Sequence, residues 1–223
     1  VTGGGNQIYG VRNSEPNKFY AVNISNGQGS APVEFSPVGS FEDFAGPLAN
    51  VPFQMSPGHF AISPGADDVL RLNLDSGRQY TFASGIGFQP TAIAADNAGG
   101  FIYVAGPDPA SSSSYLLKKV SVASGEISTV GSLSESTLEY LPQGTPDSMV
   151  WYSGALYYMG HGTDDLVKIT LNGDAIASQA KVADILDGVS IHPILGVIDA
   201  MTVGPDGQLY LASRDHQLLA SYD

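Results

Sequence analysis

The sequence repeats one short pattern four times, and each copy is a run of alternating apolar and polar residues that ends in a glycine. The copies are FYAVNISNG, VLRLNLDSG, LKKVSVASG and LVKITLNG, which end at Gly27, Gly77, Gly125 and Gly173. These glycines are 50, 48 and 48 residues apart. Because a fixed spacing of this size is typical of repeat architectures, we expect an array of similar units.

Three further stretches recur at the same period. GFIYV, GALYY and GQLYL precede the glycine motif and place Tyr103, Tyr157 and Tyr210 at 54 and 53 residue intervals. TAIA, DSMV and DAMT come before those stretches, and RQYTFA and EISTV follow the glycine. Since Gly, Asn, Asp and Pro separate the stretches, each unit is predicted to be a meander of four short antiparallel strands.

A four-stranded meander repeated at this period is typical of a β-propeller blade. The predicted fold class is all-β, a β-propeller of four-stranded antiparallel blades, with about five visible blades and both ends incomplete. We expect one domain over residues 1–223, with blades at approximately 1–39, 51–86, 88–133, 145–185 and 197–223. Small residues such as Ala92 and Ala94 suit an innermost strand. The alternative, a β-sandwich, needs no regular period.

Composition narrows the class of partner. Asp and Glu outnumber Lys and Arg by 22 to 9, for a formal charge of -13, which disfavours nucleic acid and anionic membrane surfaces. With no cysteine, disulfides and thiolate metal sites are excluded. No apolar run approaches the roughly 18 residues of a membrane span, so membrane insertion is not expected. A chain rich in turn residues, with only 14% charged residues, suits an extracellular or cell-surface bacterial protein. The periplasm is the other compartment that this composition suits.

The chain opens on Val1 rather than Met, which predicts a processed protein or a piece of a longer one. Three connections are longer than a turn between blades requires: 39–50, 134–145 and 184–197. Loops of about twelve residues in a compact fold are commonly functional. We therefore expect binding residues where these connections surround one mouth of the central channel.

A first set of candidates occupies the same place in three units, just before the first strand. Thr91, Asp147 and Asp199 would point toward a shared axis if the units form a ring. Carboxylate and hydroxyl oxygens are ligands that suit Ca²⁺, so a calcium site is one prediction. The favoured alternative is that each side chain caps its own turn by bonding a nearby backbone N–H.

A second set lies in the loops expected at the same mouth, and we assign it to ligand binding: His161, Asp164, Asp165, His192, Arg214, His216, Tyr140 and Phe44. A histidine beside carboxylates can serve as a general base. The repeat places no nucleophile beside it, however, so no catalytic residue is assigned. Loop aromatics above a channel suit a sugar ring or a peptide.

The stretches NQIYGV, GFIYVAG, GALYYMG and PDGQLYLAS carry a resemblance. Together with the glycine motifs they resemble the repeats of bacterial extracellular β-propellers, including uncharacterised surface-protein domains. A more distant likeness is to gluconolactonase and regucalcin-type propellers, which share the PDG-x-LY turn. That likeness implies an axial metal bound by acidic residues, for which only Asp147 and Asp199 have counterparts here.

These observations predict a non-catalytic extracellular binding or structural module, with a protein or glycan partner and no certain cofactor. The alternative enzyme is a metal-dependent hydrolase or lyase with its site at the channel mouth. A third possibility is a subunit of a polymeric surface appendage, assembled through unpaired blade edges.

Overall fold

The computed structural model describes part of the chain. The backbone is described at residues 7–12, 15–23, 33–34, 43–48, 58–63, 65–73, 77–96, 98–111, 114–133, 146–160, 165–184, 200–204, 206–213 and 218–222. Side chains are described at 59–63, 65–73, 77–96, 98–111, 114–133, 148–159, 166–182, 200–204, 206–212 and 221. Every regular element in this part is a β-strand, so the predicted all-β class is confirmed. Within the same residues, no helix has the length and apolar character needed to cross a membrane.

The strands form five antiparallel sheets, numbered here 1 to 5 along the chain. Sheet 1 contains β1 (Gln7–Arg12), β2 (Glu15–Asn23) and β3 (Val33–Glu34). Sheet 2 contains β4 (Asp43–Leu48), β5 (Gly58–Ile62), β6 (Val69–Asn73) and β7 (Arg78–Ala83). Sheet 3 contains β8 (Ala92–Asp96), β9 (Phe101–Pro107), β10 (Tyr115–Ser121) and β11 (Ile127–Leu133).

The last two sheets continue the series. Sheet 4 contains β12 (Pro146–Tyr152), β13 (Ala155–Gly160), β14 (Asp165–Asn172) and β15 (Ala175–Asp184). Sheet 5 contains β16 (Ala200–Val203), β17 (Leu209–Ser213) and β18 (Leu218–Tyr222). In every sheet, strands that follow one another in the sequence are hydrogen-bonded neighbours, which is the predicted meander.

The glycines that define the repeat close the turns between the last two strands of sheets 2, 3 and 4. Gly77, Gly125 and Gly173 have φ values of 65°, 72° and 59°, a backbone conformation that residues with a Cβ rarely adopt. In two of these turns the glycine N–H donates back to the preceding strand, at 2.9 Å to Asn73 O and 2.8 Å to Ser121 O. The recurring glycine is therefore a requirement of the turn geometry.

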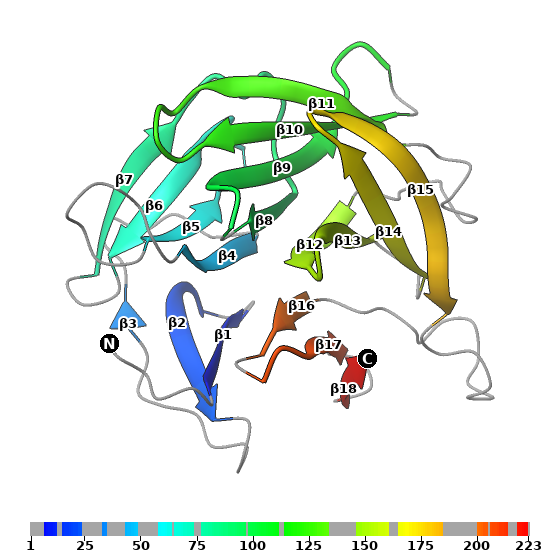
Figure 1. Ribbon diagram of the computed structural model, residues 1–223. Coiled ribbons are helices and arrows are strands. Elements are labelled where there is room, and N and C mark those ends of the chain that lie inside the picture. Colours follow the sequence, from blue (N-terminus) through cyan, green and yellow to red (C-terminus); the bar gives the residue numbers. More distant parts are fainter. Residues whose placement is uncertain are drawn as a thin grey trace.

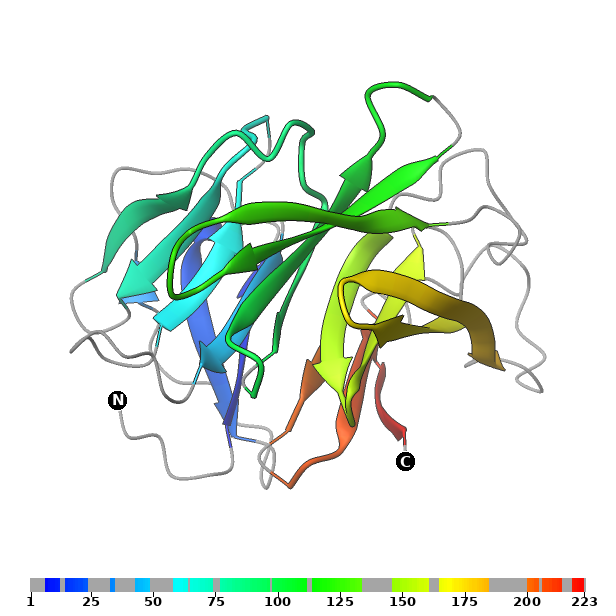
Figure 2. The same ribbon diagram turned by 45° about the horizontal axis from the view of Figure 1, so that its top comes forward.

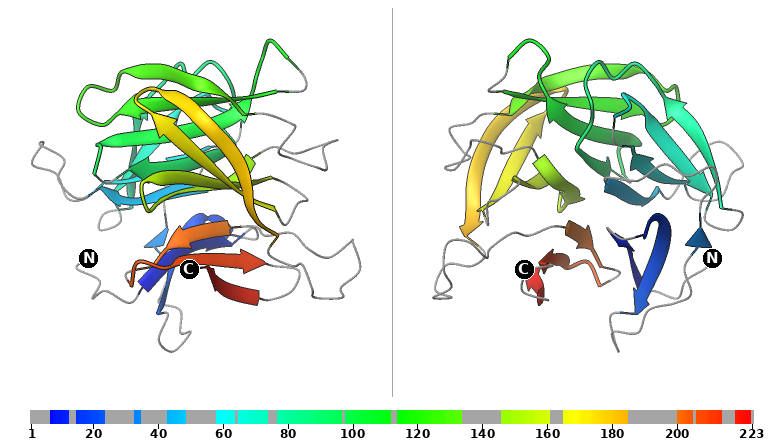
Figure 3. Two further views of the ribbon diagram at one scale, coloured as in Figure 1. Left: turned by 45° about the vertical axis from the view of Figure 1, so that its right-hand side comes forward. Right: turned by 180° about the vertical axis from the view of Figure 1, so that it is seen from behind.

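The first strands of sheets 2 to 5 lie against one another. β8 contacts both β4 and β12, and β12 also contacts β16. Figure 1 shows these strands near a common centre, with β7, β11 and β15 on the outside. The tilted and rotated views show the sheets fanning outward from that centre (Figures 2 and 3). Buried small side chains at Ala92, Ala94 and Ser148 allow the close approach of β8 and β12.

Three apolar clusters fill the spaces between adjacent sheets. One joins sheets 2 and 3 and includes Phe60 and Ile102. A second joins sheets 3 and 4 around Tyr103 and Tyr158, and a third joins sheets 4 and 5 around Met201. Sheets 3 and 4 thus each contribute their two faces to two different cores.

One expected boundary was wrong. Residues 39–50 were predicted to be a loop and the second unit to begin at 51, but β4 spans Asp43–Leu48 and is the first strand of sheet 2. The pairing of β4 with β5 shifts between Ala45 and Leu48, around Gly46 and Pro47. Since proline has no N–H for the ladder and glycine commonly marks turns, this strand looks like a loop in the sequence.

Candidate functional site

The predicted site lies where two kinds of connection emerge: those that link one sheet to the next, and those that link the second and third strands within a sheet. In sheet 2 these connections meet directly, because Ile86 N donates to Asp67 O at 3.1 Å. Ile86 belongs to the link from β7 to β8, and Asp67 to the link from β5 to β6. Both connections therefore lie on the same side of the sheet, as predicted.

The link from β7 to β8 is firmly packed. Phe88 is buried, and a Cβ added to Gly106 would come 2.4 Å from Gln89 O and 2.6 Å from the Phe88 ring. The Lys118 ammonium donates to Ile86 O and lies 5.5 Å from the centre of the Phe88 ring. These contacts tie the connection to β9 and β10, so this part of the site is a rigid support for the neighbouring loops.

Thr91 sits at the end of this connection, directly before β8. Its N–H donates to Ala105 O at 2.8 Å, and its hydroxyl donates to the same oxygen at 3.4 Å. The hydroxyl thus bonds a carbonyl of the neighbouring strand β9 rather than an N–H of its own turn. Its place in a calcium site stays a prediction.

Ser148 brings the beginnings of two inner strands together. Its buried hydroxyl accepts a hydrogen bond from Met201 N at 2.9 Å, and so connects β12 to β16. Asp147 precedes Ser148 in β12, and Ala200, the residue after Asp199, begins β16. The backbone at Asp147 therefore lies beside the start of the next inner strand, although the side chain of Asp147 and all of Asp199 are outside the described residues.

The other predicted ligand-binding residues are placed only in part. Phe44 lies in β4 rather than in a loop, and Asp165 begins β14; the side chains of both are outside the described set. The remaining candidates lie outside the described residues: Tyr140, His161, Asp164, His192, Arg214 and His216. Where side chains are described, no three His, Asp or Glu residues gather closely enough to hold a metal ion.

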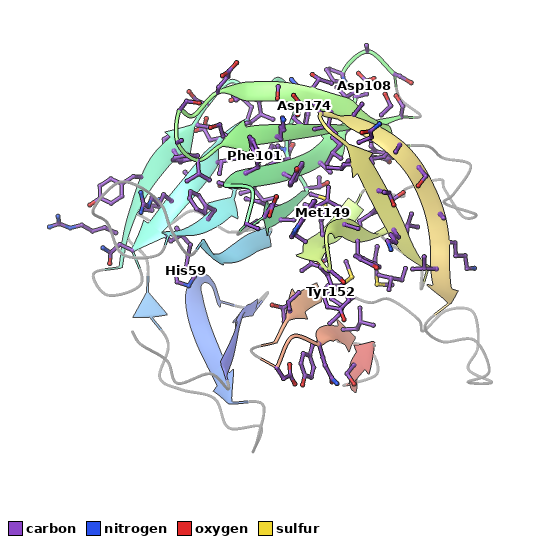
Figure 4. All side chains as sticks on the ribbon, in the orientation of Figure 1. His59, Phe101, Asp108, Met149, Tyr152 and Asp174 are labelled. Atoms are coloured by element: carbon purple, nitrogen blue, oxygen red, sulfur yellow. The ribbon has the colours of Figure 1, made fainter. Side chains whose placement is uncertain are left out.

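The opposite side of sheets 3 and 4 carries a cluster of polar and aromatic side chains around the buried Lys119. Lys119 forms an ion pair with Asp174 and lies 4.5 Å from the centre of the Phe101 ring. Tyr103 stacks on Trp151 with ring centres 5.4 Å apart and ring planes 3° from parallel. Figure 4 labels Phe101 and Asp174 at this end of the two sheets.

The chemistry of this cluster is structural. Burial, with the negative charges of Asp96 and Asp174, raises the pKa of Tyr103 to about 12, so its hydroxyl stays protonated at neutral pH. The Asp96 carboxylate accepts hydrogen bonds from Ala98 N at 3.0 Å and Gly99 N at 2.9 Å, which closes the turn into β9. Since the phenol is protonated and the carboxylate is engaged by backbone donors, neither is poised as a general base.

The PDG turn noted in the sequence is a closed unit as well. The Tyr210 hydroxyl donates to the Asp206 carboxylate at 2.6 Å, and this bond lowers the pKa of Asp206 and raises that of Tyr210. A Cβ on Gly204 would come 2.4 Å from the Tyr210 ring. The turn therefore positions β17, and both oxygens of the Asp206 carboxylate accept hydrogen bonds within it.

Two features were not found from the sequence. The Ser148–Met201 link joins residues 53 apart, close to one repeat. The second feature is a cluster of Arg71, Arg78 and Tyr80, which the register of β6 and β7 places on one face of sheet 2. The first could have been sought as a pair of complementary residues one repeat period apart. The second could have been sought from the register expected for the β6–β7 hairpin.

Solved structures similar to this chain share its fold at low sequence identity. A protein of unknown function from Bacteroides thetaiotaomicron matches 96% of this chain and 51% of its own length, with a TM-score of 0.57 and 14% identity. A chain of the nidogen–laminin complex matches 80% of this chain and 76% of its own length, at 12% identity and a TM-score of 0.50. The extracellular domain of a one-component system from B. thetaiotaomicron matches 98% of this chain and 26% of its own length, at 11% identity and a TM-score of 0.50.

No family model matches the chain, and no curated protein matches it in sequence. The chain spans about half the length of the Bacteroides protein of unknown function. At these identities the similarity shows the fold alone. The similar structures nevertheless include an extracellular domain of a bacterial protein, in line with the resemblance that the repeats carry.

Proposed function

We propose that the chain is a β-propeller module of an extracellular bacterial protein, and that it binds a ligand without catalysing a reaction. The observation that carries the proposal is the series of contacts between first strands, β4 with β8, β8 with β12 and β12 with β16, from which the sheets fan outward. In a propeller the first strand of every blade lines the central axis. The ligand would then bind at the mouth formed by the connections between sheets.

The described polar groups favour binding over catalysis. Lys119 is paired with Asp174, and Asp206 with Tyr210. The Asp96 carboxylate accepts hydrogen bonds from backbone N–H groups. A catalytic acid or base has to reach substrate, whereas these groups are engaged in holding turns and sheets together. Binding residues are commonly carried on loops above such a rigid scaffold.

A parallel screen tests this function. The purified chain would be applied to arrays of glycans and of extracellular peptides, and incubated with chromogenic ester, lactone and glycoside substrates. Saturable binding to a glycan or peptide, with no turnover above a heat-denatured control, is the expected result. Turnover that scales with protein concentration would overturn the non-catalytic assignment and favour the metal-dependent hydrolase.

A calcium ion at the inner strands is a second candidate feature of the same mouth. It is favoured by the Ser148–Met201 bond, which brings the backbone at Asp147 to the start of β16. Converging carboxylates suit Ca²⁺, which takes six to eight oxygen ligands. Ca²⁺ is expected to raise the melting temperature of the natural chain, and the Asp147→Asn/Asp199→Asn double variant should lose that rise. Equal shifts in both proteins, or none in either, would rule out this metal site.

A further inference from the structure

The outermost strand of sheet 2 carries exposed side chains that play no part in the site proposed at the loops between sheets. β7 is the last strand of its sheet, and Arg78 and Tyr80 on it are exposed, with Tyr80 at 53%. Among the described side chains, the exposed large hydrophobic residues are Tyr80 and, at 38%, Val182. An exposed tyrosine beside arginine is a composition enriched at protein interfaces.

The strand register brings a second arginine to the same face. Arg71 of β6 is directly opposite Tyr80, and Asn73 is opposite Arg78. Residues opposite one another, and residues two apart in a strand, share one face of a sheet. Arg71, Arg78 and Tyr80 therefore form one cluster, here named the Arg–Tyr face, within a chain whose formal charge is -13.

The edge beside this face is suited to another strand. β7 contains no proline, and its pairing with β6 is regular from Arg78 to Thr81 before it shifts near Ala83. An outermost strand exposes a row of backbone N–H and C=O groups that can pair with an added chain. Proteins that bind peptides by strand addition use such an edge for affinity and nearby side chains for specificity.

The other two outer strands of the four-stranded sheets differ from β7. β11 lies against β15, and the Gln179 side chain donates to Ser132 O of β11 at 3.0 Å. The outward-lying residues of β15 are mainly small, with Lys181 as its only basic side chain. Among the described side chains, only at β7 does an outer strand share one face with two arginines and an exposed tyrosine, Arg78 and Tyr80 on β7 and Arg71 on β6.

We propose that β7 is a docking edge for an extended acidic peptide segment of a partner protein. The segment would pair with β7 through its backbone and place acidic side chains at alternating positions, two residues apart, on the Arg–Tyr face. Charge complementarity selects acidic residues, and an edge strand that is outermost among the described strands of its sheet selects an extended peptide over a folded surface. This inference is independent of whether the mouth of the sheets binds a ligand.

Fluorescence anisotropy with labelled six-residue peptides, the length of β7, provides the test. One peptide alternates Asp with Thr or Val, a second has the same composition with its Asp residues in one block, and a third is the alternating peptide N-methylated at alternate backbone positions. The alternating peptide should bind about tenfold more tightly than the other two, and more weakly as salt is added.

Protein variants locate the site. Arg78→Glu and Tyr80→Ala, both at exposed positions, should each weaken binding about tenfold, and Arg71→Glu should do the same. Lys181→Glu on β15 is the matched control: it makes the same charge change on another outer strand and should leave the affinity unchanged. Equal melting temperatures would show that the variants fold. If Arg71→Glu fails to fold, the affinity of the Arg78→Glu variant, whose substitution is at an exposed position, decides whether the peptide binds at the Arg–Tyr face.

Other outcomes would overturn the proposal. Equal binding of the alternating, blocked and N-methylated peptides would show general attraction between charges rather than strand addition. Binding of an acidic polysaccharide that depends on Arg78 and Tyr80, without peptide binding, would assign the face to a glycan. Dimerisation of the natural chain that Arg78→Glu abolishes would assign it to a second copy. None of these results would decide whether a ligand binds at the loops between sheets.

Discussion

Sheet 3 meets its two neighbours in different ways. Toward sheet 2 it presents an aliphatic face, in which Ile93, Ile102 and Val104 are fully buried. Toward sheet 4 it presents Tyr103 and the buried Lys119, together with small alanines of β8. The first interface is held by non-directional burial, whereas the second adds an aromatic stack and an ion pair.

The difference shows that the two faces of one sheet contribute differently to stability and to the relative position of the sheets. Apolar packing stabilises any close approach of two faces, and many relative positions satisfy it about equally. A stacked ring pair and a charged hydrogen bond are satisfied only at a particular offset and distance. We infer that apolar burial stabilises both contacts of sheet 3, and that the directional pairs at the contact with sheet 4 also fix the position of the sheets.

The largest expected effect belongs to the aliphatic interface. Phe60→Ala removes a fully buried ring that packs edge-on against Phe82 with ring centres 5.0 Å apart. Truncating a buried phenylalanine typically costs about 3–5 kcal/mol, because transfer free energy is lost and a cavity is left. Urea unfolding followed by circular dichroism would measure the loss.

The partly buried Phe82 is the matched control for that experiment, since Phe82→Ala should cost less than Phe60→Ala. A loss below about 1 kcal/mol for Phe60→Ala would mean that the site collapses around the truncation. In that case the packing of sheet 2 against sheet 3 would stabilise the fold less than its buried rings imply.

A smaller and asymmetric effect is expected at the ion pair of the other interface. The side chain of Lys119 is 10% exposed and that of Asp174 is 79% exposed. Asp174→Asn leaves a buried ammonium beside Phe101 without its counter-charge and should cost about 1–2 kcal/mol. Lys119→Met leaves a carboxylate in water and keeps the apolar stem, so it should change stability by less than about 0.5 kcal/mol.

The difference between the stability losses of Asp174→Asn and Lys119→Met tests this expectation. Chemical denaturation of both proteins would give the two losses under the same conditions. Equal losses would indicate that Lys119 is reached by water, and that the pair behaves as a surface salt bridge. The view that directional contacts define this interface would then rest on the Tyr103–Trp151 stack alone.

The sequence predicted the fold best where a turn has a strict chemical requirement. The glycines at 77, 125 and 173 mark positions of positive φ, and their spacing gave the repeat, the meander and most strand positions. β4 was missed because Gly46 and Pro47 interrupt its alternation. Strand ends such as Pro107 of β9 were placed too early, since small residues near a strand end carry little pattern.

Contacts between sheets were harder to predict, although the repeat contains a signal for them. Lys119 and Asp174 are 55 residues apart, Ser148 and Met201 are 53, and Ser132 and Gln179 are 47. These separations are near the 48 to 50 residues between the repeat glycines, because neighbouring sheets place equivalent elements side by side. The period says which elements meet, but the pairing of side chains also depends on rotamers and burial, which alternation does not encode.

The candidate site was the least predictable part. Thr91 was identified from its place in the repeat, and its hydroxyl bonds the carbonyl of Ala105 within its own sheet. To predict a ligand set formed by loops of different sheets, one must know the relative heights and directions of those loops. Those depend on the packing between sheets rather than on any local pattern.

The smallest effect at neutral pH, and the most specific one, concerns Tyr103. Burial, followed by the charges of Asp96 and Asp174, raises its pKa from 10.0 to about 12 in the folded protein. Because the folded state holds the phenol proton more tightly than the unfolded state, this contribution is complete below pH 10.0 and is lost as the pH rises to about 12.

The free energy of unfolding of the natural protein should therefore fall more steeply across that alkaline range than that of Tyr103→Phe, whose ring can still stack on Trp151. Urea unfolding midpoints measured at a series of pH values would show the two curves diverging only above pH 10.0. Asp174→Asn should reduce the divergence, since it removes one charge that disfavours the tyrosinate. Parallel curves would mean that the Tyr103 hydroxyl is already solvated in the folded protein, and that the interface with sheet 4 is looser than its stacked rings imply.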